Sequence, residues 1–219
     1  MSQRQILVGY AEDHTMVRTS MISQLKADPG IRIIVEAGNG RQLMDRIQIL
    51  TILPDVCLVD IQMPQMGGLE LIGNMTKEWP SIRPVVVSSF CDEMTIFEAI
   101  RRGARGYLAK SCELEEVTCA IRTVFEGDYY YSSTAGIHSF NMVKKEKVCR
   151  HPCDERDQEF LRYICMEDMS YADIANKMGM SYRSVDAFSA RLSKKLGVHT
   201  RVGLAMAAQH LGLCSFGDP

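Results

Sequence analysis

The chain has 219 residues, of which 46% are hydrophobic, so it is long enough for one large or two small globular domains. Its 25 basic and 27 acidic residues give a formal net charge of −2, which argues against a polyanion-binding tail and against a disordered acidic chain. No segment approaches the ~20 apolar residues of a membrane span, and the N-terminus lacks a signal-type apolar region, so we expect a cytoplasmic protein with no membrane partner.

Short apolar runs alternate with amphipathic stretches from the start of the chain to about residue 126. The runs have the length and β-branched content of buried strands, and the stretches between them have the three-to-four spacing of helices. Five alternations predict an α/β fold, a doubly wound five-stranded parallel sheet with helices on both faces. The expected strands are 6–11, 31–37, 56–59, 84–89 and 106–109, and the expected helices lie near 15–27, 40–50, 68–78, 93–102 and 113–126.

Acidic, hydroxyl and lysine side chains follow or end four of these strands. Because the carboxyl ends of parallel strands meet at one edge of a sheet, we expect these side chains to lie close together. A lone aspartate after a strand is more often a helix cap or a turn residue, but five such positions in one chain favour a shared site. The five residues are Glu12, Asp13, Asp60, Ser89 and Lys110.

This group of side chains suits phosphoryl chemistry. Carboxylates held close together repel one another, and Mg²⁺ relieves the repulsion at a site with few protein oxygens. Asp60 would then be the nucleophile toward a phosphoryl group, while the cation and Lys110 would neutralise the transferred oxygens. Ser89 would hydrogen-bond the phosphate once it has formed. His14 follows the acidic pair and fits a solvated first-turn residue better than a metal ligand.

Four segments of this region resemble the receiver domain of response regulators, over about residues 4–126 and without a large gap. The segments are Ala-Glu-Asp-His at 11–14, Val-Asp-Ile-Gln-Met-Pro at 59–64 with Met-Gly-Gly at 66–68, Val-Ser-Ser at 87–89 and Gly-Ala-Arg-Gly-Tyr-Leu-Ala-Lys at 103–110. The resemblance implies that a sensor histidine kinase phosphorylates Asp60. It gives the Mg²⁺ ligands as Glu12, Asp13, Asp60 and the backbone carbonyl of Gln62.

The resemblance also implies a conformational switch. It assigns the switch hydroxyl to Ser89, the switch aromatic to Tyr107 and the phosphate-contacting lysine to Lys110. A phosphoryl group adds about −1.5 to −2 charge, so drawing Ser89 toward it would open space for Tyr107 to turn inward. Ser88 competes for the hydroxyl role, and the spacing from Pro84 favours Ser89. Taken alone, Tyr107 is more often a packed core aromatic.

Residues 127–152 break the alternation and are predicted to be a linker. They are rich in small, polar and charged residues, with room for one short helix within 137–147. The eight cysteines of the chain include no CxxC pair and fit free thiols in a reducing compartment. Cys149, His151 and Cys153 cluster near the end of the linker but lack the second ligand pair of a zinc site.

The rest of the chain is predicted to be helical. Asp154, with Asp157 three residues later, suits a helix N-cap, and Gly179 marks a tight turn between two helices. A helix, a turn with glycine and a second helix form a helix-turn-helix arrangement. The expected helices lie near 154–166, 170–178, 181–196 and 200–211.

The third of these helices lies in the basic part of the chain. Residues 181–201 contain five basic residues and one acid, a local charge of +4 in a nearly neutral protein. Phosphate contacts dominate nucleic-acid affinity, so this excess favours double-stranded DNA as the partner.

This region resembles the LuxR-type helix-turn-helix of the same regulator family, over about residues 154–213. The resemblance is strongest in Met-Ser-Tyr-Ala-Asp-Ile-Ala at 169–175, Ser-Val at 184–185 and Lys-Leu-Gly-Val-His-Thr-Arg at 195–201. It implies that the helix at 181–196 enters the major groove, with its first half near bases and later basic residues near phosphates. The candidate DNA contacts are Ser181, Tyr182, Arg183, Ser184, Asp186, Arg191, Lys194, Lys195 and Arg201.

Asp186 departs from the family pattern, which commonly has a lysine at this position. An acid there repels backbone phosphate but can accept a hydrogen bond from a cytosine amino group. Any sequence preference should therefore differ from the usual one of the family, and the helical module could instead dock a protein partner.

Together these features predict a phosphorylation-dependent transcription regulator, with a receiver at 1–126, a linker at 127–152 and a DNA-binding domain at 153–219. A homodimer is expected, because two DNA half-sites suit a two-fold protein. The alternative is a receiver-controlled protein-docking module without DNA binding. A phospho-aspartyl enzyme such as a phosphatase usually needs a second aspartate where this chain has Gln62, so we do not expect an enzyme that turns over an outside substrate.

Overall fold

The computed structural model describes residues 4–131, 153–166, 169–196, 198 and 200–214. The chain forms two compact units, Met1–Gly136 and Ile137–Asp218. The predicted short helix within 137–147 lies outside the described residues. None of the helices in the described ranges is long and apolar enough to cross a membrane.

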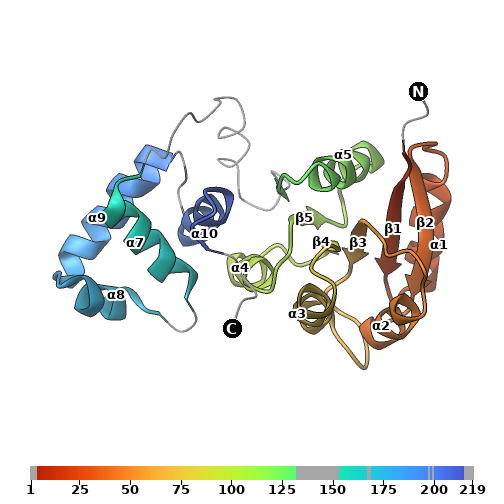
Figure 1. The fold of residues 1–219 in the computed structure, drawn as a ribbon, viewed down its shortest axis with the longest axis horizontal. Coiled ribbons are helices and arrows are strands. Elements are labelled where there is room, and N and C mark those ends of the chain that lie inside the picture. Colours follow the sequence, from red (N-terminus) through yellow and green to blue (C-terminus); the bar gives the residue numbers. More distant parts are fainter. Residues whose placement is uncertain (1–3, 132–152, 167–168, 197, 199, 215–219) are drawn as a thin grey trace. The chain divides into compact units, whose positions relative to one another are not determined.

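The first unit is built on a parallel sheet with the strand order β2-β1-β3-β4-β5-β6 (Figure 1). Its strands are β1 (Ile6–Ala11), β2 (Ile31–Ala37), β3 (Val56–Val59), β4 (Arg83–Ser88), β5 (Gly106–Ala109) and β6 (Tyr130–Tyr131). Its helices are α1 (Thr15–Leu25), α2 (Gly40–Gln48), α3 (Gly68–Glu78), α4 (Glu93–Arg101) and α5 (Leu114–Phe125). The doubly wound parallel sheet predicted from the sequence is therefore confirmed.

Two details of the sheet differ from the prediction. Strand β4 begins one residue earlier than expected and ends at Ser88, so Ser89 lies beyond the strand. A sixth strand, β6, pairs with β5 inside the predicted linker, and its Tyr131 is buried. The sheet therefore extends past residue 126, and any linker begins after Tyr131.

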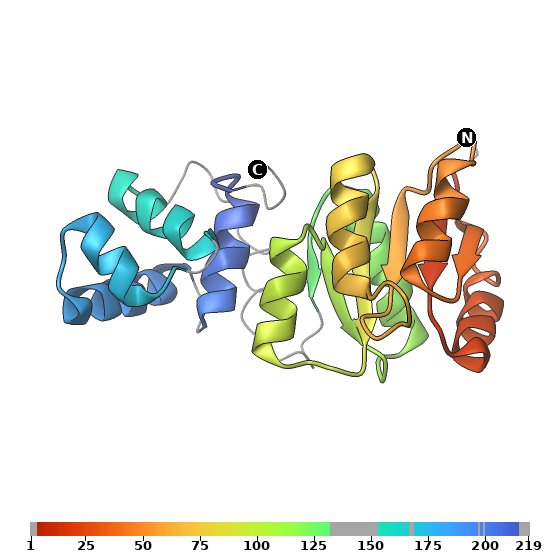
Figure 2. The ribbon, with the colours of Figure 1, turned by 90° about the horizontal axis from the view of Figure 1, so that it is seen from below.

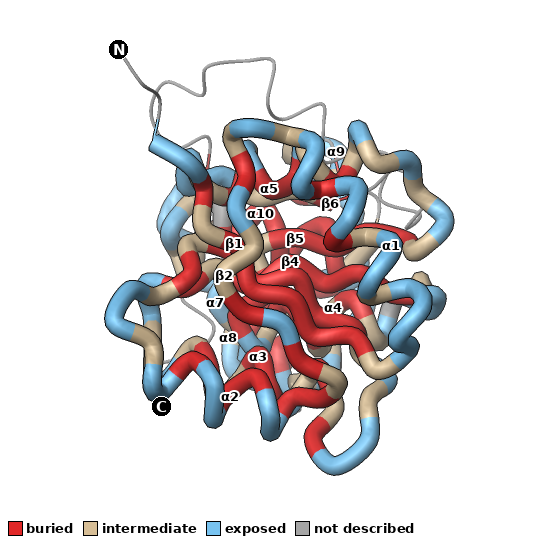
Figure 3. The backbone as a smooth tube through the Cα atoms, turned by 90° about the vertical axis from the view of Figure 1, so that its right-hand side faces the viewer, coloured by how far each residue is buried: buried red, intermediate tan, exposed pale blue. Residues whose placement is uncertain are grey.

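Helices cover both faces of the sheet. One face packs against α1 and α5, where Ile22 and Val117 join a cluster that includes Val85 and Val87 of β4. Since side chains alternate along a strand, Ser88 points to the opposite face, which α2, α3 and α4 cover (Figure 2). Figure 3 shows the central strands as buried along their length, as expected for a parallel sheet between two helical layers.

The second unit consists of four described helices, α7 (Glu155–Cys165), α8 (Tyr171–Met178), α9 (Tyr182–Leu196) and α10 (Arg201–His210). Their bounds match the prediction to within one residue. Asp154 caps α7 in a capping box with Asp157, as the sequence predicts, and Ser170 caps α8 in the same way. Gly179 has φ +62 and ends α8 in the left-handed conformation that glycine adopts freely. The chain then enters α9, which completes the helix-turn-helix.

Candidate functional site

The carboxyl edge of the sheet brings together side chains from three strand ends. Glu12 follows β1, Asp60 follows β3 and Lys110 follows β5. The backbone fixes these positions, because the Asp60 N–H donates to the carbonyl of Ala11 at 2.9 Å and the Lys110 N–H donates to that of Ser88 at 2.8 Å. The edge lies where strand order reverses around β1 and β3, the usual place for a ligand site in such sheets.

Lys110 is the centre of this cluster. Its Nζ lies 2.8 Å from Glu12 Oε2 and 3.0 Å from Asp60 Oδ2. Both carboxylates are buried, with 0% of Glu12 and 3% of Asp60 exposed, so solvent screens their charges little. The single ammonium group therefore holds two buried acids at the edge of the sheet.

Burial and pairing act in opposite directions on these groups. Burial raises the pKa of Asp60, and the hydrogen bond and charge of Lys110 offset part of that rise. Burial lowers the pKa of Lys110, but its ion pairs with Glu12 and Asp60 outweigh burial and leave that pKa raised. Lys110 is therefore charged at neutral pH and is placed to meet further negative charge.

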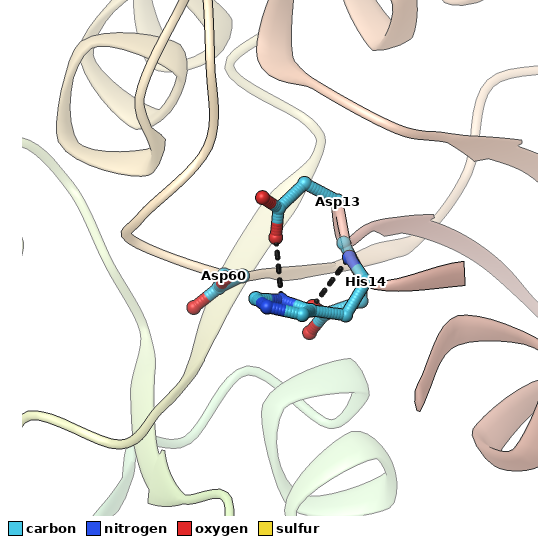
Figure 4. Close-up of side chains that lie close together, drawn as sticks. Asp13, His14 and Asp60 are labelled. Carbon is cyan, nitrogen blue, oxygen red and sulfur yellow. Dashed lines mark hydrogen bonds and ion pairs between the residues drawn. The ribbon is translucent and has the colours of Figure 1, made fainter. Parts of the chain in front are cut away.

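The same edge can hold a cation. Glu12, Asp13, His14 and Asp60 each offer a ligand atom, and these atoms all lie within 4.8 Å of one another. Asp13 Oδ1 is shielded from solvent and pairs with His14 Nδ1 at 2.8 Å (Figure 4). Carboxylate oxygens gathered this closely suit a hard divalent ion. Gln62 lies in the exposed loop two residues after Asp60, and its carbonyl stays a predicted ligand.

Gly68 allows the loop after Asp60 to close. A Cβ at Gly68 would lie 2.1 Å from the carbonyl oxygen of Asp60, far inside van der Waals contact. The Gly68 N–H also donates to the Ile61 carbonyl at 2.9 Å, which ties the start of α3 to the residue after Asp60. This close backbone approach explains why a glycine stands at this position in the sequence motif.

The two serines at the end of β4 have different environments. Ser88 is buried, and its Oγ accepts a hydrogen bond from the Phe90 N–H at 3.1 Å, whereas Ser89 is exposed. Ser88 also pairs with Ala109 in the sheet, next to Lys110. Its position favours Ser88 over Ser89 as the hydroxyl of the site, contrary to the expectation from sequence spacing. The expected strand ran from 84 to 89, whereas β4 runs from Arg83 to Ser88, so Ser88 is the residue at the end of the strand.

Tyr107 lies fully inside the first unit. It is 0% exposed, and its hydroxyl donates to the backbone carbonyl of Phe90, at the start of the segment that leads into α4. Burial raises the pKa of Tyr107, and a hydrogen bond with Ser88 acts in the opposite direction. The phenol therefore links Ser88 to the residues before α4, a connection from the charged edge to the surface of the unit.

In the second unit, α9 presents the candidate contacts for DNA. The residues at its start and along one side are exposed, whereas Val185 and Leu192 are buried in the core of the unit. Ser181 and Ser184 share a hydroxyl contact of 2.7 Å, and the Ser184 N–H donates to Ser181 Oγ, so these two serines also cap the helix. The exposed candidates are Ser181, Tyr182, Arg183, Ser184, Asp186, Arg191, Lys194 and Lys195.

Three of the predicted basic contacts also have partners within the unit. Arg191 Nη2 and Lys195 Nζ lie 2.7 Å and 2.5 Å from the carboxylate of Asp157. Arg201 donates to the carbonyl of Met169, and its guanidinium lies over the ring of Tyr171, which joins α10 to the start of α8. Sequence reasoning identified these charges but missed their structural contacts.

A groove of about 610 Å³ runs beside α9 and the start of α10. It brings Asp186, Lys194 and Arg201 to one surface, so an acid and two bases line the same groove. The groove is lined by Tyr171, Asp186, Ser189, Ala190, Ser193, Lys194, Val198, Thr200 and Arg201.

Comparison with known families identifies both units. Residues 8–122 match the response regulator receiver domain, and residues 155–208 match the luxR family of bacterial regulatory proteins. The first match covers more than half of the chain, and the chain belongs to the response regulator family. It is a two-component response regulator and a DNA-binding transcription regulator of the LuxR family, not an enzyme.

Relatives of similar length span both units. The transcriptional regulatory protein UhpA of Salmonella typhimurium is 29% identical over 200 residues, which cover 91% of this chain and 96% of UhpA. The DNA-binding transcriptional activator DevR/DosR of Mycobacterium tuberculosis is 27% identical over 208 residues, which cover 94% of this chain and 95% of that protein.

Solved structures give the same architecture. The response regulator ChrA of a heme-sensing two-component system is 25% identical, with a TM-score of 0.52 and coverage of 96% of this chain and 99% of ChrA. An RcsB–DNA complex is similar in fold, with 18% identity, a TM-score of 0.57 and coverage of 94% of this chain and 98% of RcsB.

Proposed function

We propose that Asp60 is the phosphoacceptor of this response regulator and that a sensor histidine kinase is its phosphodonor. The observation that carries the proposal is the pairing of Lys110 with the buried Asp60 at 3.0 Å, beside Glu12 at 2.8 Å. A candidate nucleophile, a second acid and a lysine thus meet at one sheet edge in a chain of the receiver family, which supports the proposal.

The chemistry follows from this arrangement. An Asp60 carboxylate oxygen attacks the phosphorus of a phosphohistidine, so a P–O bond forms, the P–N bond breaks and the imidazole leaves. Lys110 is charged and lies beside the nucleophile, so it can accept the oxygens of the arriving phosphoryl group as hydrogen-bond partners. Mg²⁺ held by Glu12, Asp13, Asp60 and the Gln62 carbonyl would supply further neutralisation of those oxygens.

The buried Ser88 hydroxyl and Tyr107 phenol would connect phosphorylation of Asp60 to a structural change at the surface of the unit. We assign the switch hydroxyl to Ser88, because it lies on the sheet beside Lys110 and contacts Tyr107. A phosphoryl group adds about −1.5 to −2 charge, which draws hydroxyl donors toward Asp60. Movement of Ser88 would change its bond to the Phe90 N–H, and Phe90 also holds the Tyr107 hydroxyl. The segment before α4 is then the element that responds.

The second unit is proposed to bind double-stranded DNA through α9. Tyr182, Arg183 and Asp186 face outward near its start and would reach bases, while Lys194 would contact phosphate. A homodimer on two half-sites fits this arrangement, and RcsB has been solved as dimers bound to DNA. The first unit would thus act as receiver, residues 153–219 as output domain, and the segment between them as linker.

Phosphoryl transfer can be tested directly on the full-length chain. Incubation with phosphoramidate and Mg²⁺ should add one phosphoryl group, detected by intact mass and removed by hydroxylamine. Asp60→Asn should abolish the addition, whereas Asp45→Asn, at an exposed position of α2, should leave it unchanged. Hydroxylamine-labile phosphate on the Asp60→Asn chain would disprove the assignment.

DNA binding needs its own experiment, because a helical unit of this kind could also dock a protein. Selection from a randomised duplex pool, with and without phosphodonor, should enrich a specific site, and the phosphorylated chain should bind it more tightly. Enrichment of no sequence in either state would favour the protein-docking function, and Asp186 would be the first residue to replace.

A further inference from the structure

Two cysteine thiols lie against each other in the second unit. Cys165 is the last residue of α7, and Cys214 follows α10 in the chain. Their sulfur atoms are 2.7 Å apart and share an S–H···S hydrogen bond, although the two residues are 49 positions apart in sequence. Both cysteines are free thiols, and neither belongs to the charged edge of the sheet or to the exposed side of α9.

The turn after α10 carries Cys214 back toward α7. Gly212 has φ +67, a left-handed conformation that costs glycine nothing sterically. Its N–H donates to the Gln209 carbonyl at 3.0 Å, and the Leu213 N–H donates to the Ala208 carbonyl at 2.9 Å. This pair of bonds is a Schellman motif, which ends the helix and turns the chain. The backbone therefore sets the position of Cys214 in addition to the thiol contact.

The two thiols differ in exposure and in acidity. Cys165 is 8% exposed and packs on α10, with its sulfur 4.0 Å from the carbonyl oxygen of Ala205, whereas Cys214 is partly exposed. The hydrogen bond between the thiols raises the pKa of Cys165 and lowers the pKa of Cys214. Because the thiolate is the reactive form, Cys214 is the thiol that reacts first with an oxidant. Cys165 is then the resolving thiol.

We propose that Cys165 and Cys214 form an oxidisable dithiol site in the DNA-binding unit, with hydrogen peroxide as the oxidant. The Cys214 thiolate attacks one peroxide oxygen, so an S–O bond forms, the O–O bond breaks, and hydroxide takes up a proton and leaves as water. The Cys165 sulfur then attacks the Cys214 sulfenic acid, so the S–S bond forms, the S–O bond breaks and a second water leaves with the Cys165 proton. Two thiols lose two electrons, and one peroxide is reduced to two waters.

Little movement is needed to form this bond. The sulfur atoms must approach by about 0.7 Å from their present 2.7 Å to reach a disulfide length. The bond would close a loop that contains α8, α9 and α10, and therefore the whole helix-turn-helix. Such a cross-link restricts the unfolded chain, so oxidation should stabilise the second unit against unfolding. This proposal is independent of phosphorylation at Asp60.

The test uses the reduced full-length chain. A slight molar excess of hydrogen peroxide is added, free thiols are alkylated, and a protease digest is analysed by mass spectrometry. We expect a peptide pair joined through Cys165 and Cys214, two hydrogen masses lighter than the separate peptides, which dithiothreitol releases. The same treatment in urea should remove the preference for this pair. Sulfinic acid on Cys214 without a cross-link, or a bond from Cys214 to another cysteine, would overturn the proposal.

Thermal unfolding gives a second readout with a matched control. Oxidation should raise the unfolding midpoint of the second unit by about 5 °C or more, and reduction should reverse the rise. Cys119→Ser, at an exposed cysteine of α5, should keep this shift, and Cys214→Ser should lose it. An equal shift in the Cys214→Ser chain would contradict the proposal. The wild-type mass analysis still decides the question if Cys214→Ser does not fold.

Discussion

The ammonium group of Lys195 on α9 lies 2.5 Å from the carboxylate of Asp157 on α7. Asp157 is fully buried, and Arg191 approaches its other oxygen at 2.7 Å, so the carboxylate ties the helix-turn-helix to the first helix of its unit. Burial raises the pKa of Asp157, but its two basic partners outweigh burial and leave the pKa below its ordinary value. The ionised carboxylate therefore stabilises the folded unit.

Replacing Asp157 should show how far the stability of the second unit depends on the ionised carboxylate. Asp157→Asn leaves two cations without their acid and should destabilise the second unit at pH 7 by about 2 kcal/mol, less than for a fully buried pair because the cations reach solvent. A carboxylate with a lowered pKa contributes stability above its unfolded pKa near 3.8, and this contribution is lost as pH falls through the folded value. The difference from wild type should therefore begin to shrink below about pH 4 and disappear only below the lowered pKa of the folded state. Denaturant titration across pH measures the difference in free energy of unfolding between wild type and Asp157→Asn, with Glu155→Gln as control. A difference that does not change with pH would argue against the ion pairs.

Neighbouring lysines on α9 should separate structural from DNA-binding roles. Lys194→Met should weaken DNA binding for all sequences and reduce its salt dependence, with no loss of stability, because Lys194 is exposed and lines the groove. Lys195→Met should lower the unfolding midpoint, because it removes a partner of Asp157. Fluorescence anisotropy and thermal unfolding of both variants check this, with Lys26→Ala in the first unit as control. Equal effects of both variants on stability would contradict the assignment.

Alanine substitutions at two glycines of α3 should change the free energy of unfolding in opposite directions. Gly68→Ala places a Cβ 2.1 Å from the Asp60 carbonyl oxygen, so it should destabilise the first unit and impair phosphorylation. Gly73→Ala, in the same helix with its nearest atom at 3.9 Å, should stabilise the unit by about 0.5–1 kcal/mol. Urea unfolding of the two variants tests this contrast. A Gly68→Ala chain with wild-type stability would mean that the loop after Asp60 adapts freely.

The serines at the end of β4 test the switch assignment. Ser88→Ala removes the hydroxyl that contacts Tyr107 and the Phe90 N–H, so phosphorylation should enhance DNA binding less than in wild type. Ser89→Ala changes an exposed side chain and should leave that enhancement intact. Binding titrations with and without phosphodonor give the comparison. The reverse outcome would restore the sequence-based assignment to Ser89.

The sequence predicts most of the fold because its signals are local. The strand at 56–59 and the other main strands are short apolar runs that can be recognised locally. The closeness of Glu12, Asp60 and Lys110 follows from the rule that the carboxyl ends of parallel strands meet at one edge. The serine pair shows the limit of this reasoning. A shift of one residue in β4 exchanges the faces of the sheet on which the two serines lie. The pairing of Ser88 with Ala109 gives the register of this strand, and this relation is absent from the local pattern.

Long-range contacts could not be predicted, because the signals in the sequence are local. Asp157 pairs with Lys195 across 38 positions, and no periodicity connects them. The sequence therefore showed Lys195 only as part of a basic stretch, not as a structural partner. Strand β6 was missed because two residues are too short for an alternating pattern, and its pairing with β5 defines it.

The measurement that tests the account most directly is the DNA affinity of the full-length chain with and without phosphoramidate, compared among wild type, Asp60→Asn and Asp45→Asn. Wild type and Asp45→Asn should gain at least about fivefold in affinity for the selected site on phosphorylation, and Asp60→Asn should gain nothing. An equal gain in the Asp60→Asn chain, or no gain in wild type that carries the phosphoryl group, would contradict the claim that Asp60 controls DNA binding.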